Sequence, residues 1–453
     1  MKRDKCMKRI LSLLLSILAV FCLVLPAKAA GDADGVSEKD AIYDLTLNAQ
    51  GVYLFNVDTG TALYEKSADI RMYPASTTKI MTALVVLDEC ADPKNTTVTV
   101  EDTSTFAYII EDGGVHMSLV KGESFTVYDL LLGLMMNSYC DVADLLAYHF
   151  GDGSVDVFVE KMNEKAKDLG LENTHFCNAH GLHDPEHYSS PRDIATFFEK
   201  ALENPIFREI ISTRSYTVPA TSKRGERSLS YSVRCFYESN KFYREHYVGG
   251  KSGFTDQAGR CLAVLSEKDG VSYVSVLLDC EDLNIVYEET ALLSDYVFDH
   301  YEVVTLFEEG TEIGKIPVPE AEAELSVLIG EEVRVLIRKG TEPAYSVELP
   351  ESITIPEAEN GAEIGLLSPS FNGEAIPEAY PLILFRDESV PLTTKSELQK
   401  GAEASWDSVT GIFETDRVFV GLIIGLIVLI ALCIPAMKIT RLLHKRNSHL
   451  PKH

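Results

Sequence analysis

Three short groups of residues in this 453-residue chain combine nucleophilic and basic side chains. In the first, Ser76-Thr77-Thr78-Lys79, the serine and the lysine are three positions apart. Apolar residues recur at helical spacing from Ile80 onward, so the group is predicted to start a helix with Ser76 and Lys79 on one face. A serine hydroxyl attacks only when a base takes its proton, and a lysine with a lowered pKa can be that base. The group therefore predicts an activated serine.

Two further groups could complete such a site. Ser138-Tyr139-Cys140 falls in a predicted break between helices, and Gly250-Lys251-Ser252-Gly253 falls on a predicted strand. Each group alone has a simpler structural interpretation. The first group is also compatible with a capped helix that carries a surface lysine, and the third with a polar edge strand. A phosphate-binding loop at Lys251 is excluded, since that motif needs a glycine where Glu245 stands.

The elements that position these groups follow from hydrophobic patterning. Residues 52–57 and 62–64 are predicted to form a hairpin, and the strands 261–266 and 271–279 a second one. Predicted helices lie between the two hairpins, and another helix follows at 283–301. Helices separate one early hairpin from several late strands. We therefore predict an α+β fold with a mainly antiparallel sheet, in which the early and the late strands lie in one sheet and helices flank it.

The sequence predicts six segments. Residues 41–300 are expected to form the catalytic domain. Short strands alternating with glycine, proline and glutamate turns predict a small all-β domain over 302–387. A stalk is expected at 388–417. The other three segments are an N-terminal leader (1–29), a membrane span (418–437) and a tail (438–453).

Both ends of the chain carry targeting signals. Basic residues, an apolar run and small residues near Ala29 predict a secretory signal peptide over residues 1–29, with an uncleaved anchor helix as the alternative. Residues 418–437 are apolar and long enough to span a bilayer, and basic residues follow them. We therefore expect a single-pass protein of the cell membrane with an extracytoplasmic catalytic domain. The net charge of −28 argues against nucleic acid as a partner.

Six cysteines lie between these end segments. No pair has the spacing of a zinc site, and a domain of this size does not need disulfide bonds for stability. We therefore expect mostly free, buried thiols. They are Cys90, Cys140, Cys177, Cys235, Cys261 and Cys280.

Taken together, the three groups resemble the S-x-x-K, S-x-N and K-T-G or K-S-G signatures of the low-molecular-mass penicillin-binding proteins, the serine-type D-alanyl-D-alanine carboxypeptidases. Their order and spacing suit that family, as do residues 178–182 and 255–259. The resemblance covers roughly residues 41–298 and, more loosely, the β domain. It implies a β-lactamase/DD-peptidase-like fold and hydrolysis of peptidoglycan pentapeptides during cell-wall maturation.

The resemblance also implies a role for each catalytic side chain. Ser76 would attack the carbonyl between two terminal D-alanines and become an acyl-ester. Lys79 would accept the serine proton, and Ser138 would relay a proton to the leaving amine. β-Lactam antibiotics, which mimic the dipeptide, would acylate Ser76 as inhibitors.

The third group supplies the implied substrate-binding residues. Lys251 and Ser252 would hold the terminal carboxylate, and Gly253 and Phe254 would continue this strand beside the substrate. The backbone N–H groups of Ser76 and Phe254 would form the oxyanion hole.

Cys140 departs from the family, which usually has asparagine there. A thiol donates only weakly, so we expect weaker substrate positioning or an altered preference, without loss of acylation. The alternative is a small buried residue without a role.

No metal or cofactor is expected. His180, His183, His187 and Asp184 could mimic a ligand cluster, but they lie in a loop that matches the family. Two other functions share the same chemistry: a β-lactamase-like hydrolase, and a slowly turning over penicillin-binding sensor or scaffold. Rapid hydrolysis of the drug would distinguish the first.

Overall fold

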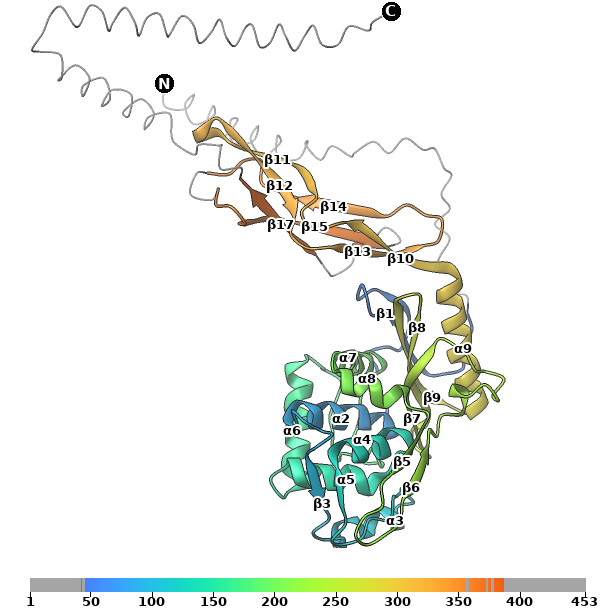
Figure 1. The fold of residues 1–453 in the computed structure, drawn as a ribbon. Helices are drawn as coiled ribbons and strands as arrows, with labels where there is room; N and C mark the ends of the chain where they lie inside the picture. The colour runs from blue at the N-terminus through green and yellow to red at the C-terminus, as the bar shows by residue number, and fades with distance from the viewer. Residues whose placement is uncertain (1–41, 43–44, 355–357, 372–373, 376–378, 387–453) are drawn as a thin grey trace, which may run out of the picture. The chain divides into compact units, whose positions relative to one another are not determined.

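The computed structural model describes residues 42, 45–354, 358–371, 374–375 and 379–386 (Figure 1). The predicted signal peptide, stalk, membrane span and tail lie outside these residues. The chain up to Thr46 is a separate unit, in which the Leu45 amide donates to the Ile42 carbonyl at 3.2 Å. Among the described residues, no helix combines the length and apolar character needed to cross a bilayer.

A five-stranded antiparallel sheet forms the centre of the catalytic region. Its strand order is β2-β1-β9-β8-β7, so the early hairpin joins the late strands as the sequence predicts. Leu54 lies opposite Ser275 where the two hairpins meet. The strands are β1 (Gly51–Asn56), β2 (Ala62–Lys66), β7 (Tyr247–Thr255), β8 (Gly259–Lys268) and β9 (Val271–Cys280).

Helices cover both faces of this sheet. Helix α7 packs on β1 and β9, whereas α9 packs on β8 and β9 on the opposite face (Figure 1). This double covering explains why β9 is buried almost along its whole length. The larger helices are α2 (Thr78–Glu89), α4 (Val127–Met136), α5 (Cys140–Phe150), α6 (Val155–Asp168), α7 (Pro191–Leu202), α8 (Pro205–Ser212) and α9 (Leu283–His300).

Capping residues set several helix starts. Thr126 and Asp129 form a capping box at the start of α4, and Ser190 caps α7 ahead of Pro191. Helix α2 begins at Thr78, two residues later than its sequence pattern suggested, because Ala75–Thr77 form a 3₁₀ turn, η2. Every residue of α2 from Thr78 to Leu87 is buried, so this helix is the centre of the helical layer.

Shorter elements complete the catalytic region. They are β3 (Thr97–Thr99) paired with β4 (Ser124–Thr126), β5 (Ser215–Val218) paired with β6 (Arg227–Ser230), α3 (Ala107–Glu111), and the 3₁₀ turns η3 (Ser104–Phe106) and η4 (Arg234–Phe236). All six described cysteines are free, and all but Cys177 are buried, as expected.

From Tyr301 onward the described chain consists mainly of strands with their own apolar core. Two strands, β10 (Tyr301–Phe307) and β13 (Val333–Arg338), pair with each other, and the others follow the order β11-β12-β17-β15-β14, with β16 beside β15. Val327, Leu367 and Leu382 are fully buried in this core. The remaining elements are β11 (Glu312–Val318), η5 (Pro319–Ala321), β12 (Ala323–Ile329), β14 (Ala344–Glu348), β15 (Glu363–Phe371), β16 (Glu374–Ala375) and β17 (Tyr380–Phe385).

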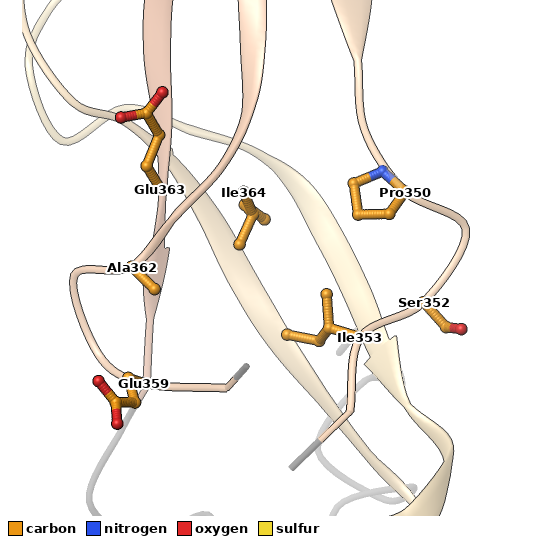
Figure 2. A pocket seen from close by; sticks show the side chains of 7 residues that line it. All are labelled: Pro350, Ser352, Ile353, Glu359, Ala362, Glu363 and Ile364. Carbon is orange, nitrogen blue, oxygen red and sulfur yellow. The ribbon is translucent and has the colours of Figure 1, made fainter. Parts of the chain in front are cut away.

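This β region also carries a pocket between the segment at 350–353 and the start of β15. Ile353 and Ile364 extend into it from opposite sides (Figure 2). None of the three sequence groups contributes to it.

Candidate active site

A cleft in the described catalytic region is lined by side chains from all three sequence groups. Ser76, Ser138 and Ser252 line it together with Gly253 and Phe254. The 3₁₀ turn η2, the break before α5 and strand β7 are far apart in the sequence, and the sheet and helical layer bring them together. The cleft thus contains one serine from each group.

The nucleophile candidate lies on a strained turn. Ala75 has a φ of 47°, in the left-handed region that a residue with a Cβ rarely adopts. Ser76 follows directly, and its Oγ accepts a hydrogen bond of 3.0 Å from Lys79 Nζ. The turn therefore holds the hydroxyl at the cleft surface with the amine behind it.

Two glycines allow neighbouring backbone to approach this turn closely. A Cβ on Gly181, whose φ is 78°, would meet the Ala75 carbonyl oxygen at 1.9 Å. A Cβ on Gly253 would meet the Ser76 amide nitrogen at 2.9 Å. Both positions need glycine, because any side chain would push the backbone away from the serine.

Lys79 is fully buried, and its Nζ contacts three acceptors. Besides Ser76 Oγ, it donates to the His180 carbonyl in a short hydrogen bond and lies 3.5 Å from Cys140 Sγ. Burial lowers the pKa of Lys79, because the charged form loses its hydration, whereas Cys140 and Asp144 act in the opposite direction. The site therefore favours the neutral amine that a general base must be.

Lys251 is equally buried, but it is not among the residues lining the cleft. Its Nζ donates to its own neighbour's carbonyl, Ser252 O, at 2.8 Å. Burial holds its pKa well below the usual range, and repulsion from Lys79 adds to the effect. The Lys251 amine therefore lies within the wall, while Ser252 lines the cleft.

The second group presents Ser138 to the cleft and turns Cys140 inward. Ser138 has a φ of 63°, so the chain reverses sharply before α5. Cys140 is the first residue of α5, is buried, and its amide donates to the Val115 carbonyl at 2.7 Å. Its sulfur therefore faces Lys79 and not the cleft, which is lined by Ser138 and Val115.

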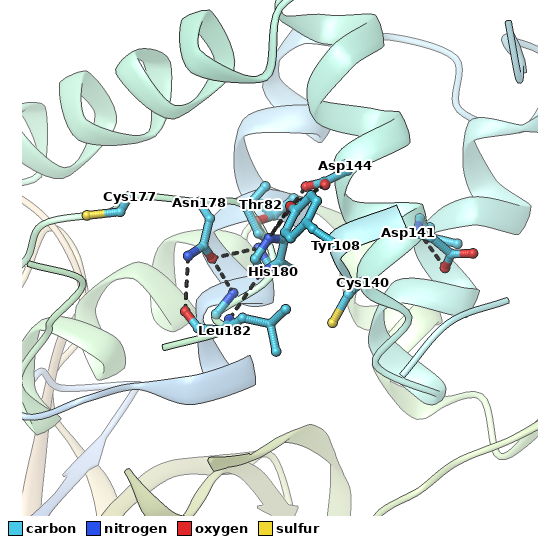
Figure 3. A network of polar contacts seen from close by, with 12 residues as sticks. Thr82, Tyr108, Cys140, Asp141, Asp144, Cys177, Asn178, His180 and Leu182 are labelled. Atoms are coloured by element: carbon cyan, nitrogen blue, oxygen red, sulfur yellow. Dashed lines mark hydrogen bonds and ion pairs between the residues drawn. The ribbon is translucent and has the colours of Figure 1, made fainter. Parts of the chain in front are cut away.

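The loop that holds Lys79 is itself closely bonded (Figure 3). Asn178 Oδ1 accepts from the amides of His180 and Gly181, and its Nδ2 donates to the Leu182 carbonyl. The Leu182 amide donates to His180 Nδ1 at 3.0 Å, so the proton of this neutral imidazole is on Nε2. The predicted stretch 178–182 thus presents a carbonyl to the catalytic amine.

Sequence reasoning missed Arg260, which also lines the cleft. The guanidinium lies 3.7 Å from the centroid of the Phe254 ring, which is 48% exposed. Phe254 and Arg260 are cross-strand partners in β7 and β8. Only the register of β7 against β8 brings Arg260 beside Phe254, and the sequence pattern does not give that register.

The other histidines singled out in the sequence have structural contacts. His187 Nε2 is hydrogen-bonded to Thr78 Oγ1 at 2.8 Å, and its Nδ1 accepts from the Cys177 amide. The His183 ring packs edge-on against Tyr73. Burial lowers the pKa of His187 to about 3, so this ring is neutral at pH 7.

A buried lysine beside a serine that follows a strained turn, in a cleft that also contains Ser138 and Ser252, defines a class of active-serine hydrolases with a lysine base. The fold, a helix-covered antiparallel sheet, is that of the DD-peptidases. A family model described as D-alanyl-D-alanine carboxypeptidase, the peptidase S11 family, matches residues 36–282. The chain belongs to this family.

Named relatives agree with this assignment. The chain is 32% identical over 274 residues to a D-alanyl-D-alanine carboxypeptidase of Streptomyces sp. strain K15, covering 58% of this chain and 92% of the relative. It is 27% identical over 399 residues to the Bacillus subtilis D-alanyl-D-alanine carboxypeptidase DacF, covering 87% and 95%. The structure of penicillin-binding protein 5 from Haemophilus influenzae matches with a TM-score of 0.65 at 26% identity, covering 76% of this chain and 98% of that one.

Proposed function

We propose that this chain is a serine-type D-alanyl-D-alanine carboxypeptidase that removes the terminal D-alanine from peptidoglycan stem pentapeptides. The observation that carries the proposal is the 3.0 Å hydrogen bond between Ser76 Oγ and the buried Lys79 amine. Burial makes that amine a base, and the turn makes the hydroxyl accessible. The product would be a shortened stem peptide and free D-alanine.

Acylation begins with proton transfer from Ser76 to Lys79. A neutral amine has two N–H donors and one lone pair. In the neutral amine the two donors can point at the His180 carbonyl and Cys140 Sγ; the direction of the Ser76 contact then reverses, and the Lys79 lone pair accepts from the Ser76 hydroxyl. Ser76 Oγ then bonds to the penultimate carbonyl carbon and the C–N bond breaks. The proton that Lys79 took from Ser76 would be relayed through the Ser138 hydroxyl to the leaving D-alanine amine, which returns Lys79 to its neutral form. Water releases the acyl chain in the second half-reaction.

Substrate binding is assigned to the β7 side of the cleft. Ser252 and Gly253 line it, and Ser252 would donate to the terminal carboxylate. Arg260 supplies a guanidinium on the same side, whereas the buried Lys251 amine would act on the substrate through the Ser252 backbone, whose carbonyl accepts its hydrogen bond. The amides of Ser76 and Phe254 would stabilise the oxyanion.

Cys140 has a more specific role in this scheme than the sequence suggested. Its sulfur lies beside Lys79 and away from the cleft, so it would orient the amine and affect the substrate only indirectly. Thiol sulfur is a weak acceptor compared with an amide oxygen. We therefore still expect slower turnover than with asparagine, and no loss of acylation.

The proposed location is the outer face of the cell membrane. It is supported by the N-terminal signal pattern over 1–29 and by the apolar run at 418–437 with its basic flank. We also propose the domain limits given above: a catalytic domain at 41–300, a β domain at 302–387 and a stalk at 388–417.

D-Alanine release from a pentapeptide ending in D-Ala-D-Ala tests the function. The wild-type protein is expected to release one D-alanine per peptide, and Ser76→Ala none. A wild type that releases no D-alanine but hydrolyses penicillin rapidly would contradict the proposal.

A further inference from the structure

A buried acid lies close to the catalytic lysine and is not used in the mechanism above. Asp144 is on α5, one turn after Cys140, and its side chain is 1% exposed. Its Oδ2 accepts a hydrogen bond of 2.6 Å from the Tyr108 hydroxyl. Its Oδ1 has no hydrogen-bond partner within the described residues and lies 3.7 Å from His180 Nε2.

Tyr108 connects this acid to the loop that holds Lys79 (Figure 3). The Tyr108 oxygen lies 2.8 Å from His180 Nε2. Because His180 Nδ1 accepts from the Leu182 amide, Nε2 carries the proton and donates to Tyr108, which in turn donates to Asp144. A continuous chain of hydrogen bonds therefore joins the Asp144 carboxylate to the turn whose carbonyl accepts from Lys79.

We propose that Asp144 and Tyr108 are positioning residues for the general base. Through His180 they fix the carbonyl that orients the Lys79 amine, and the Asp144 charge acts on the proton equilibrium of that amine. This inference rests on the proposed function, since it assigns Lys79 as the base.

The electrostatics agree with this arrangement. Asp144 opposes the effect of burial on the Lys79 pKa, because a nearby negative charge stabilises the ammonium form. Burial raises the pKa of Asp144 itself to about 6, against the effects of Tyr108 and Lys79. The other titratable groups that act on this pair are Cys140 and Asp141 on α5, Lys251 on β7, and His180 and His187 on the loop after α6.

Two substitutions separate the charge from the hydrogen bonds. Asp144→Asn keeps an oxygen that can accept from Tyr108 but removes the charge. The rate of Ser76 acylation by penicillin is measured as a function of pH. In this variant the acid limb of the profile is expected to move to lower pH by about one unit, because the Lys79 ammonium form loses a stabilising negative charge. Tyr108→Phe keeps the charge but breaks the chain, so the acylation rate constant is expected to fall about tenfold with little change in drug affinity.

A matched pair controls for general effects of such changes. Tyr128 Oη donates to Glu209 Oε1 at 2.7 Å on the exposed surface, the same kind of contact at residues that do not line the cleft. Tyr128→Phe and Glu209→Gln should leave the pH profile unchanged.

The proposal is overturned if Asp144→Asn and Tyr108→Phe give pH profiles and acylation rates identical to wild type. If Asp144→Asn does not fold, the acylation rate constant of Tyr108→Phe tests the proposal by itself, and a rate constant equal to wild type overturns it. Tyr108→Phe is expected to fold, because it removes one hydroxyl from a residue that is 40% exposed. A wild type that penicillin does not acylate at all would instead refute the proposed function, so the two failures are distinguishable.

Discussion

At the scale of single residues, the environment of each amine and carboxylate sets its charge, and these charges decide whether Lys79 can act as a base. Lys79 and Lys251 are both fully buried, and two ammonium groups in one wall are unfavourable. Lys251 Nζ donates to the Ser252 carbonyl, whereas Lys79 Nζ lies 3.0 Å from Ser76 Oγ. The burial of the two lysines therefore favours a neutral Lys79 that can act as the base, and the half-buried Arg260 brings a guanidinium to the cleft lining.

Lys79→Arg tests the base directly. A guanidinium stays protonated in proteins, so it cannot accept the Ser76 proton even where it fits the site. The acylation rate by penicillin is expected to fall about 10³-fold while the protein remains folded. Acylation at the wild-type rate would exclude Lys79 as the base.

Arg260→Gln tests recognition of the terminal carboxylate. KM for a peptide ending in free D-Ala-D-Ala is expected to rise about tenfold with kcat little changed, because a charge-assisted hydrogen bond is lost. Arg260→Lys should recover part of the loss. A peptide with an amidated C-terminus provides the control, since its KM should not depend on residue 260; equal effects on both peptides would contradict the assignment.

The raised pKa of Asp144 also has a consequence for stability. An acid whose folded-state pKa lies above its unfolded value destabilises the fold once the unfolded chain ionises. The cost is absent below about pH 4, grows up to about pH 6 and stays constant above it. Asp144→Asn cannot ionise, so it should be more stable than wild type at pH 8 by up to about 3 kcal/mol and equal to it at pH 4. Denaturant unfolding at the two pH values checks this, and an equal difference at both would contradict it.

The three sequence groups were found from the sequence because each is a local pattern of spacing. Arg260, Tyr108 and Asp144 were not, because their positions depend on strand register and on packing between distant segments. Asp144 did leave a weak signal, since an acid four residues after Cys140 shares its helix face. The inward orientation of Cys140 and Lys251 could not be predicted, as burial of a polar side chain is decided by tertiary contacts.

At the scale of elements, the site depends on backbone that can approach the nucleophile turn. The sequence predicted the hairpins and the α9 helix, because these follow from turn chemistry and periodicity. It placed the start of α2 too early, because a 3₁₀ turn and an α-helix begin with the same pattern. The strain at Ala75 and the close approach of Gly181 become visible only when the His180 loop packs on η2.

Gly181→Ala tests this close approach. The new Cβ would lie 1.9 Å from the Ala75 carbonyl oxygen at a φ of 78°, so the loop must move. We expect a loss of about 3 kcal/mol or more in unfolding free energy, together with slower acylation. Gly170→Ala is the control: its φ is 71° but no atom lies within 4 Å of the new Cβ, so it should cost about 1 kcal/mol and leave acylation unchanged. Equal effects of the two changes would contradict the packing argument.

At the scale of the whole molecule, all the residues assigned to the reaction lie before residue 301. The β region has its own buried core, and the Streptomyces relative aligns over 92% of its length with only 58% of this chain. A chain that ends at residue 301 is therefore expected to fold and to be acylated by penicillin within about twofold of the wild-type rate. Failure of that chain to fold would show that the proposed boundary is wrong.

The most direct test of the central claim is mass spectrometry of the protein after exposure to penicillin. We expect one penicilloyl adduct, located on the peptide that contains Ser76, and no adduct on Ser76→Ala. An unmodified wild-type protein, or an adduct that persists at another residue of Ser76→Ala, would contradict the assignment of Ser76 as the nucleophile.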